Sequence, residues 1–146
     1  MNIFIDVRLC SYSYQGLKTY IENILPYILE SEHTFFLAGF KEFLNNYKKY
    51  KNVKPIYFEA PINSLKEQIL GIKIKKEVED KINIYFFPYP SIPVVFLNKN
   101  FVVILHDVTP YKFWYFYNPI KVILGYFITK IIAKKTRSKE IKRRKI

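Results

Sequence analysis

Two side chains that could take part in chemistry, His106 and Asp107, come directly after a run of five apolar residues, 101–105. A continuous apolar run that Pro110 closes a few positions later is typical of a strand buried on both faces. Ligands bind at the carboxyl ends of strands in open α/β sheets, so we expect this imidazole and this carboxylate at the rim of a site. The alternative is a loop in which Asp107 accepts hydrogen bonds from nearby backbone amides, and the segment alone does not distinguish the two.

A second candidate is the loop of residues 8–16, which has no periodic pattern and ends at Gly16 just before a helix. The amino terminus of a helix offers unpaired N–H groups and a positive dipole end, and both favour a bound anion. The first strand-to-helix loop of a doubly wound sheet also faces the ligand crevice. A single glycine is weak evidence, and a helix entry without a ligand is the commoner explanation of one glycine in this place.

Aromatic side chains accompany these polar groups. Tyr89 and Ser91 lie in a segment that three prolines stiffen, 88–93, and Trp114 and Tyr115 lie in a later aromatic stretch. Flat aromatic rings cover the C–H faces of sugars, while carboxylates and imidazoles bind sugar hydroxyl groups. The residues therefore favour a sugar site, although ordinary packing is the alternative for each ring taken singly.

The elements that must position these groups alternate between strand and helix. This alternation predicts a doubly wound, mostly parallel sheet with helices on both faces, which is a Rossmann-like α/β fold. Pro55 argues for an edge position of the third strand, because proline cannot donate to the ladder. The predicted strands span residues 2–7, 33–40, 53–59, 82–87 and 101–105, and the predicted helices span 17–29, 41–50, 62–81 and 118–136.

The clearest helix is 17–29, because its apolar residues recur at intervals of three and four and so fall on one face. These residues are Leu17, Tyr20, Ile21, Ile24, Leu25, Ile28 and Leu29. We expect this face to pack against the sheet.

The 146 residues are enough for one domain with its own core. The net charge is +12, and residues 134–146 contribute +7 of it through eight Lys or Arg and one Glu. We therefore divide the chain into a domain, 1–133, and a basic tail, 134–146, which we expect to be disordered or a frayed helix. Such a tail gives only salt-sensitive, sequence-independent affinity for nucleic acid, and no DNA- or RNA-reading motif accompanies it. Nucleic acid is therefore not an expected partner.

Composition disfavours several kinds of site and location. Cys10 is the only cysteine, which excludes an internal disulfide and a cysteine-based zinc site. His33 and His106 are the only histidines, so no metal is expected. The chain shows no secretory signal, and its longest apolar stretch, 120–133, holds two lysines and falls short of the roughly 20 residues of a membrane span. We expect a cytoplasmic protein.

The chain resembles the amino-terminal half of family 4 glycosyltransferases, which have the GT-B architecture. Four stretches within about residues 1–133 carry the resemblance: NIFIDVR, GLKTYIENIL, IYFFPYPSIP and VVILHDVTPYKFWYFYNPIK. The His-Asp motif, with the proline and the aromatic loop after it, is the most specific of them. The resemblance implies an enzyme that moves a sugar from a nucleotide-sugar donor to a glycan or lipid-linked acceptor, with retention of anomeric configuration. It implies no metal and no cofactor beyond this co-substrate.

The resemblance also implies roles for single residues. Gly16 matches the glycine loop beside the donor diphosphate, and Lys18 could supply the positive charge of the arginine in the family's G-[IV]-G-R-Y pattern. His106 matches the histidine near the reacting sugar, with Asp107 holding its loop. The candidates for binding the sugar or the acceptor are Tyr89, Ser91 and Trp114.

The chain departs from the family in three respects. The loop lacks the second glycine after Gly16, Phe86 stands where relatives often have a histidine, and the pattern is lost after Ala133. The family's second Rossmann-like half, which holds the nucleotide and a pair of glutamates, should follow there. We therefore expect a truncated, split or frameshifted enzyme that has little activity alone and needs a separate carboxyl-terminal half, because the transition state in such a cleft is stabilised from both walls.

The alternative function is a non-catalytic binding module at an anionic membrane surface. The stretch 120–133, with its lysines and the basic tail beside it, could rest on anionic lipid, where each Lys or Arg contributes about 1 kcal/mol. The two hypotheses are compatible, because the family's substrates include membrane-linked sugars. A peripheral position on the inner face of the membrane fits both.

Overall fold

The computed structural model of the chain describes residues 1–12, 15–89, 91–104, 123, 126–127 and 129–134. The described part includes four of the candidate site residues, which are Gly16, Lys18, Tyr89 and Ser91. The others, His106, Asp107 and Trp114, lie outside the described residues, as does the basic tail from residue 135 onwards. The expectations for these residues stay predictions.

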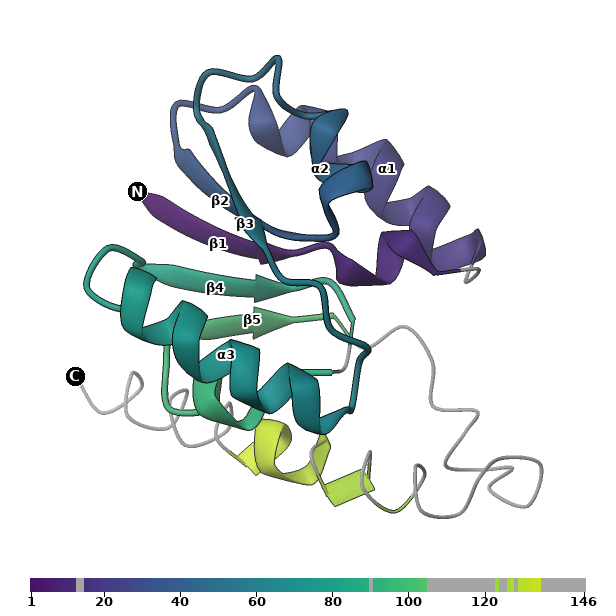
Figure 1. Cartoon of the computed structure of the whole chain (residues 1–146), viewed down its shortest axis with the longest axis vertical. Helices are drawn as coiled ribbons and strands as arrows, with labels where there is room; N and C mark the ends of the chain where they lie inside the picture. The colour runs from purple at the N-terminus through teal and green to yellow at the C-terminus, as the bar shows by residue number, and fades with distance from the viewer. Residues whose placement is uncertain (13–14, 90, 105–122, 124–125, 128, 135–146) are drawn as a thin grey trace.

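Within the described residues, five parallel strands form one sheet in the order β3-β2-β1-β4-β5 (Figure 1). Their bounds are Asn2–Asp6 for β1, Thr34–Gly39 for β2, Val53–Tyr57 for β3, Ile84–Phe87 for β4 and Phe101–Val103 for β5. In the middle of the sheet, Ile5 of β1 pairs with Leu37 of β2 and with Phe86 of β4. The predicted α/β class with a parallel sheet is confirmed.

Helices cover both faces of this sheet (Figure 1). The helices α1, Gln15–Leu29, and α2, Lys41–Asn45, pack on one face, and α3, Leu65–Val78, packs on the other. Two short 3-10 helices complete the described part: η1, Arg8–Ser11, follows β1, and η2, Val94–Phe96, packs beside α3. The last helical residues, 129–134, reach the α3 face through Ile132, which is 5% exposed.

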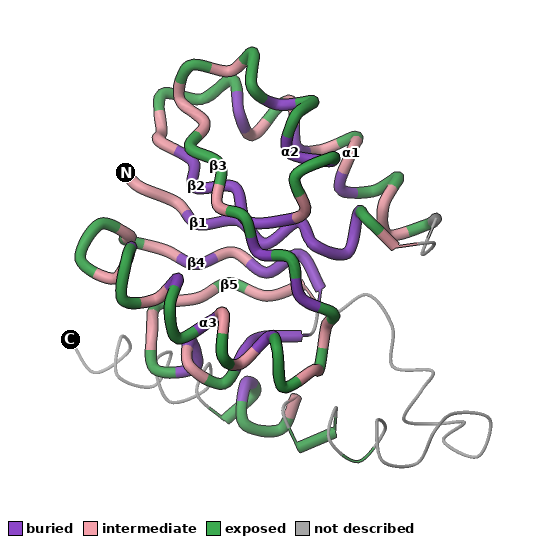
Figure 2. Tube along the Cα trace, in the orientation of Figure 1, coloured by how far each residue is buried: buried purple, intermediate pink, exposed green. Residues whose placement is uncertain are grey.

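Side chains that alternate along the strands divide the core into two clusters, one on each face of the sheet. Phe4 and Phe36 join the cluster under α3, and Ile5 and Leu37 join the cluster under α1. Figure 2 shows that burial is concentrated in the middle strands and on the inner sides of the helices. The residues of α1 that face the sheet are Ile21, Leu25 and Leu29, each 1% exposed. The predicted apolar stripe is therefore confirmed for these three residues, Leu17, Ile24 and Ile28 beside them are partly buried, and Tyr20, which is 37% exposed, does not belong to the buried face.

The outer strands of the described sheet differ from the middle ones. β3 pairs only with β2, in the edge position that Pro55 predicted. β5 pairs only with β4 among the described strands, and its central residue, Val102, is 52% exposed. The prediction that this strand is buried on both faces is therefore wrong. Phe101 and Val103 pack against the α3-face core, while Val102 points to the opposite face, which no described helix covers at this position.

Candidate functional site

The carboxyl ends of β1 and β4 meet where the direction of the connections reverses. From β1 the chain runs through α1 to β2 and on to β3, and then crosses through α3 to β4 on the other side of β1. In an open α/β sheet, ligands bind outside the carboxyl ends of the strands at such a topological switch point. The loops after β1 and β4 therefore form the candidate site of this fold.

A buried ionic cluster lies at the end of β1. Arg8 is 0% exposed, and its Nη2 lies 2.7 Å from Oδ2 of Asp6 and 2.7 Å from Oε1 of Glu67. The Nε of Arg8 also donates to both carboxylate oxygens of Asp6, at 3.0 and 3.1 Å. The guanidinium carbon lies 3.8 Å from the centre of the Phe58 ring, and Nη1 donates to the carbonyl of Ala60 at 3.4 Å. One cation thus joins the end of β1, the segment after β3 and the first turn of α3.

The way α3 begins fixes Glu67 in this cluster. Ser64 is the N-cap residue, and its Oγ accepts a hydrogen bond from the N–H of Glu67 at 3.1 Å. In return, Oε2 of Glu67 accepts from the N–H of Asn63 at 2.9 Å, an arrangement close to a capping box. Asn63 has a φ of 59°, a left-handed conformation that asparagine tolerates better than most residues. One carboxylate oxygen is therefore held by the helix start, and the other is directed to Arg8.

The charges in this cluster shift the pKa values of Arg8 and Glu67. Burial on its own lowers the pKa of the Arg8 guanidinium, but the nearby carboxylates, Asp6 foremost, outweigh burial and hold that pKa above its ordinary value. Burial raises the pKa of Glu67, and the charge of Asp6 adds to the rise, while Arg8 and the N–H of Asn63 oppose it. Two buried carboxylates thus share one positive charge, and its removal would leave both uncompensated.

Tyr89 and Ser91, which we expected at the rim, are largely covered by protein. Tyr89 is 2% exposed and packs in the α1-face core, so its ring is not presented to solvent. Its hydroxyl group makes no hydrogen bond with the described residues, and burial together with the charge of Asp6 raises its pKa well above the ordinary value. Ser91 is 8% exposed, and its Oγ donates to Oδ1 of Asn63 at 3.1 Å. Both residues belong to the base of the site in this conformation.

Gly16 lies in the first turn of α1, at the carboxyl edge of the sheet. Its φ is not positive, and a Cβ placed on it would meet no atom within 4 Å. Neither the backbone conformation nor packing therefore requires a glycine here. Lys18 lies along the surface of the helix, where its Nζ is 3.9 Å from the carboxylate of Glu22, and a half-exposed pair of this kind has little energetic weight.

Sequence reasoning missed the cluster of Asp6, Arg8 and Glu67. Two signals for it were present. A carboxylate at the end of an otherwise apolar strand is unusual unless it is paired, and Ser64 and Glu67 have the spacing of a capping box. The contact between Arg8 and Glu67 spans 59 positions of the chain, and no local pattern encodes it.

In the described part of the chain, no three His, Cys, Asp or Glu side chains lie close enough together to hold a metal ion. The helices described there also include none with the length and apolar content to cross a membrane. Compared with protein-family models, with curated proteins and with solved structures, the chain matches none. Fold and site thus define an α/β protein with a Rossmann-like parallel sheet and a buried ionic cluster at its switch point.

Proposed function

We propose that the chain is the acceptor-side half of a GT-B glycosyltransferase, which moves a sugar from a nucleotide-sugar donor to a glycan or lipid-linked acceptor with retention. The observation that carries the proposal is the pairing of β1 with β4 in a parallel sheet. This pairing brings the glycine loop after β1 and the loop after β4 to one edge, and these are the loops from which the sequence resemblance is drawn. β5, whose apolar run leads to His106 and Asp107, is parallel to β4 and ends at the same edge.

Four of the candidate residues have a direct role in this proposal. The N–H groups at the start of α1, beside Gly16, face the donor diphosphate, since a helix amino terminus favours an anion. His106 lies near the reacting sugar, Asp107 holds its loop, and Trp114 contacts the acceptor. The buried cluster around Arg8 keeps the end of β1 and the start of α3 in a fixed relation, so that the loops of the site hold their geometry.

The proposal predicts no turnover by these 146 residues on their own. Charge on the leaving diphosphate and on the sugar must be stabilised from both sides of a closed cleft, and the second side is a further Rossmann-like unit that holds the nucleotide. The purified chain is mixed with nucleotide sugars and glycan acceptors, with and without such a unit, and released nucleoside diphosphate is measured. Turnover by the chain alone would show that this domain catalyses transfer without a second unit, and would contradict the prediction. If no donor-binding unit restores transfer, the assignment as half of an enzyme is wrong.

Gly16→Ala separates a ligand role of this glycine from a structural one. Alanine is the better helix former and its Cβ meets no atom, so the free energy of unfolding should stay unchanged or rise by up to about 1 kcal/mol. Affinity for inorganic pyrophosphate, which stands in for the donor diphosphate, should fall several-fold, because the added methyl group lies where the diphosphate would approach the N–H groups. Urea unfolding measures the first effect, and an NMR titration with pyrophosphate measures the second. Thr19→Ala, at an exposed position of the same helix, is the matched control. Equal pyrophosphate affinity of Gly16→Ala and the unmodified chain would remove Gly16 from the site.

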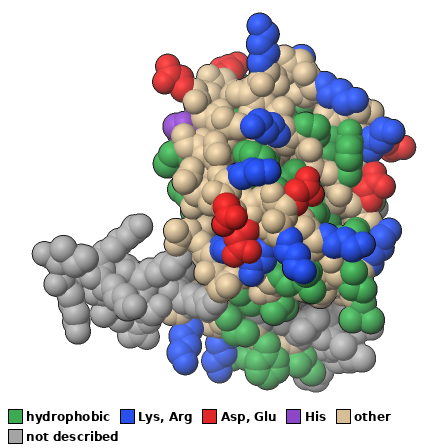
Figure 3. Space-filling model, turned by 60° about the vertical axis from the view of Figure 1, so that its left-hand side comes forward, with side chains coloured by type: hydrophobic (Ala, Val, Ile, Leu, Met, Phe, Trp, Pro, Cys, Tyr) green, Lys and Arg blue, Asp and Glu red, His purple; other side chains and the backbone are tan. Residues whose placement is uncertain are grey.

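A second candidate function, peripheral binding to an anionic membrane, is favoured by the last described helical residues. Ile123, Tyr126 and Phe127 are 57%, 50% and 58% exposed, while Ile132 is buried against the core. The Nζ of Lys130 lies 5.5 Å from the centre of the Tyr126 ring. Figure 3 shows hydrophobic side chains gathered at the lower end of the molecule with lysines beside them. Apolar residues next to lysines are typical of a helix that lies in the bilayer interface.

Ile123→Ser together with Phe127→Ser is expected to reduce partitioning onto vesicles that contain phosphatidylserine by at least about tenfold, because two exposed apolar side chains are lost. Removal of residues 135–146 should reduce partitioning further and weaken its salt dependence. Vesicle flotation measures both effects, with phosphatidylcholine vesicles as the lipid control. Tyr27→Ser, at a 77% exposed position of α1, is the protein control. Unchanged partitioning of the double variant would exclude this surface.

A further inference from the structure

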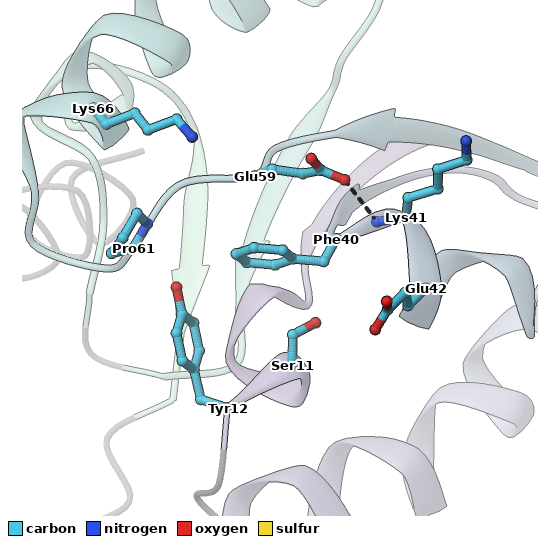
Figure 4. A pocket seen from close by; sticks show the side chains of 8 residues that line it. All are labelled: Ser11, Tyr12, Phe40, Lys41, Glu42, Glu59, Pro61 and Lys66. Atoms are coloured by element: carbon cyan, nitrogen blue, oxygen red, sulfur yellow. Dashed lines mark hydrogen bonds between the residues drawn. The ribbon is translucent and has the colours of Figure 1, made fainter.

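A pocket of about 480 Å³ opens at the carboxyl edge of the sheet, beyond the ends of β2 and β3 (Figure 4). Sites for small molecules have volumes of roughly 300–1,000 Å³, so the pocket is large enough for one. None of the residues assigned above to the donor or the reacting sugar lines it. Its lining residues are Ser11, Tyr12, Phe40, Lys41, Glu42, Glu59, Pro61 and Lys66.

The pocket combines aromatic rings with polar groups. The rings of Tyr12 and Phe40 meet edge to face, with centroids 5.7 Å apart and an angle of 86° between their planes. Figure 4 shows Glu59 above the Phe40 ring, with its carboxylate directed toward the backbone N of Lys41, and Lys66 on the opposite side of the pocket. Rings provide surface for the C–H face of a sugar, and carboxylates accept hydrogen bonds from its hydroxyl groups.

The formal charges around the pocket balance. Lys41 and Lys66 contribute two positive charges, and Glu42 and Glu59 contribute two negative ones. The Oε1 of Glu59 accepts a hydrogen bond from the N–H of Lys41 at 3.2 Å, while its other oxygen takes none from the described residues. A balanced lining with an open carboxylate oxygen favours a neutral ligand rich in hydroxyl donors over an anion.

The wall that carries Glu59 is held from behind by the buried cluster. Its neighbours Phe58 and Ala60 are both 0% exposed, and Arg8 contacts the ring of the first and donates to the carbonyl of the second. The N–H of Phe58 donates to the carbonyl of Gly39 at 3.0 Å, which continues the pairing of β2 and β3 past the end of β3. Glu59 is therefore presented outward on a fixed backbone, and such preorganisation reduces the entropy lost on binding.

We propose that this pocket binds a neutral pyranose unit. Glu59 accepts a hydrogen bond from a sugar hydroxyl group, the rings of Tyr12 and Phe40 cover a C–H face, and Lys66 borders the outer side. In the glycosyltransferase role, on which this part of the inference rests, the bound pyranose is a unit of the acceptor glycan.

An NMR titration of the full chain with methyl α-glucopyranoside, methyl α-galactopyranoside and the charged methyl glucuronide tests the pocket. At least one neutral glycoside should shift the backbone amide signals of Tyr12, Lys41 and Glu59. Glu59→Gln keeps an acceptor for the Lys41 N–H but removes the charge, and it should weaken this binding about tenfold. Glu77→Gln, at an exposed position of α3 outside the pocket, should leave it unchanged. Three results would overturn the proposal: no shifts at the pocket with any neutral glycoside, tighter binding of the glucuronide, or equal affinity of Glu59→Gln and the unmodified chain.

The pocket and the enzyme role can fail separately. Pyrophosphate binding that depends on Gly16, without glycoside shifts at the pocket, would overturn the pocket proposal and leave the donor role of Gly16 standing. The opposite outcome is also possible: glycosides shift the pocket signals in a way that depends on Glu59, but no second unit gives the chain transferase activity. This outcome would overturn the enzyme role and leave the pocket proposal standing. Glycoside affinity in Gly16→Ala should equal that of the unmodified chain, because Gly16 is not part of the lining.

Discussion

Replacing Arg8 with methionine should lower the free energy of unfolding by about 3–5 kcal/mol at neutral pH. Methionine fills much of the volume of arginine, but it leaves the carboxylates of Asp6 and Glu67, which are 0% and 1% exposed, without their cation. It also removes the hydrogen bond to the carbonyl of Ala60. Urea-induced unfolding followed by circular dichroism measures the change.

Two further variants test whether the loss of stability comes from the unpaired buried carboxylates. Lys18→Met breaks the half-exposed pair with Glu22 and should cost no more than about 0.5 kcal/mol. Arg8→Met combined with Asp6→Asn and Glu67→Gln should regain most of the lost stability, because a buried ion group replaced as a whole by neutral side chains leaves no uncompensated charge. A loss below about 1 kcal/mol for Arg8→Met alone would contradict the account of the cluster.

The loss in Arg8→Met should also depend on pH. Burial raises the pKa of Glu67 and Arg8 opposes this rise, so without the guanidinium the folded-state pKa of Glu67 should lie further above the roughly 4 of an unfolded chain. A carboxyl group whose pKa is higher in the folded than in the unfolded state binds its proton more tightly in the folded state. It therefore contributes stability at low pH, and this contribution is lost as the pH rises from about 4 through the folded-state pKa. The difference in stability between the variant and the unmodified chain should therefore be smaller at about pH 5 than at about pH 7.5. A difference that does not change over this range would exclude the protonation of Glu67 as its source.

Phe96→Ala should lower the free energy of unfolding by about 3–5 kcal/mol. Phe96 is 0% exposed, and the centre of its ring lies 5.5 Å from that of Phe4, 5.2 Å from Tyr85 and 6.1 Å from Phe87. Alanine would leave a cavity among these rings, which bind β1, β4 and η2 into one core. Thermal and urea unfolding measure the loss.

Phe96→Leu is the matched variant for this position. Leucine keeps most of the buried apolar volume, so it should cost less than about 1.5 kcal/mol. Val94→Ala, at a 59% exposed position of the same short helix, should change stability by less than about 0.5 kcal/mol. Equal losses for the alanine and leucine variants of Phe96 would show that cavity formation is not the cause.

Local patterns were sufficient to predict the layers of the fold. Apolar spacing in residues 17–29 marks the buried face of α1, and Pro55 marks an edge strand. The exposure of Val102 could not be predicted in this way, because it depends on which strands and helices lie beside β5 and not on the β5 sequence. Phe96 belonged to no predicted element, since three residues of 3-10 helix are too short to show a period.

The candidate site was predictable only in its topology. A parallel sheet with β1 beside β4 places the loops after these strands at one edge, and Gly16 and Tyr89 follow those strands. A proline-rich loop has no periodic pattern of apolar residues from which the direction of a side chain can be predicted. The burial of Tyr89 could therefore not be predicted from the sequence. The pocket beside Glu59 likewise depends on packing among three segments that are distant in the sequence, 11–12, 40–42 and 59–66.

The central place of β1 also constrains the order in which the chain can fold during its synthesis. Ile3 pairs with Phe35 on one side and with Ile84 on the other, so the second partner becomes available only after much more of the chain has left the ribosome. Closing the longer loop also costs more chain entropy. β1, β2 and β3 can therefore associate first, and in that intermediate Arg8 already has Asp6 but lacks Glu67. Until β4 has been synthesised, the side of β1 that pairs with it is an unpaired strand edge, which can pair with another chain.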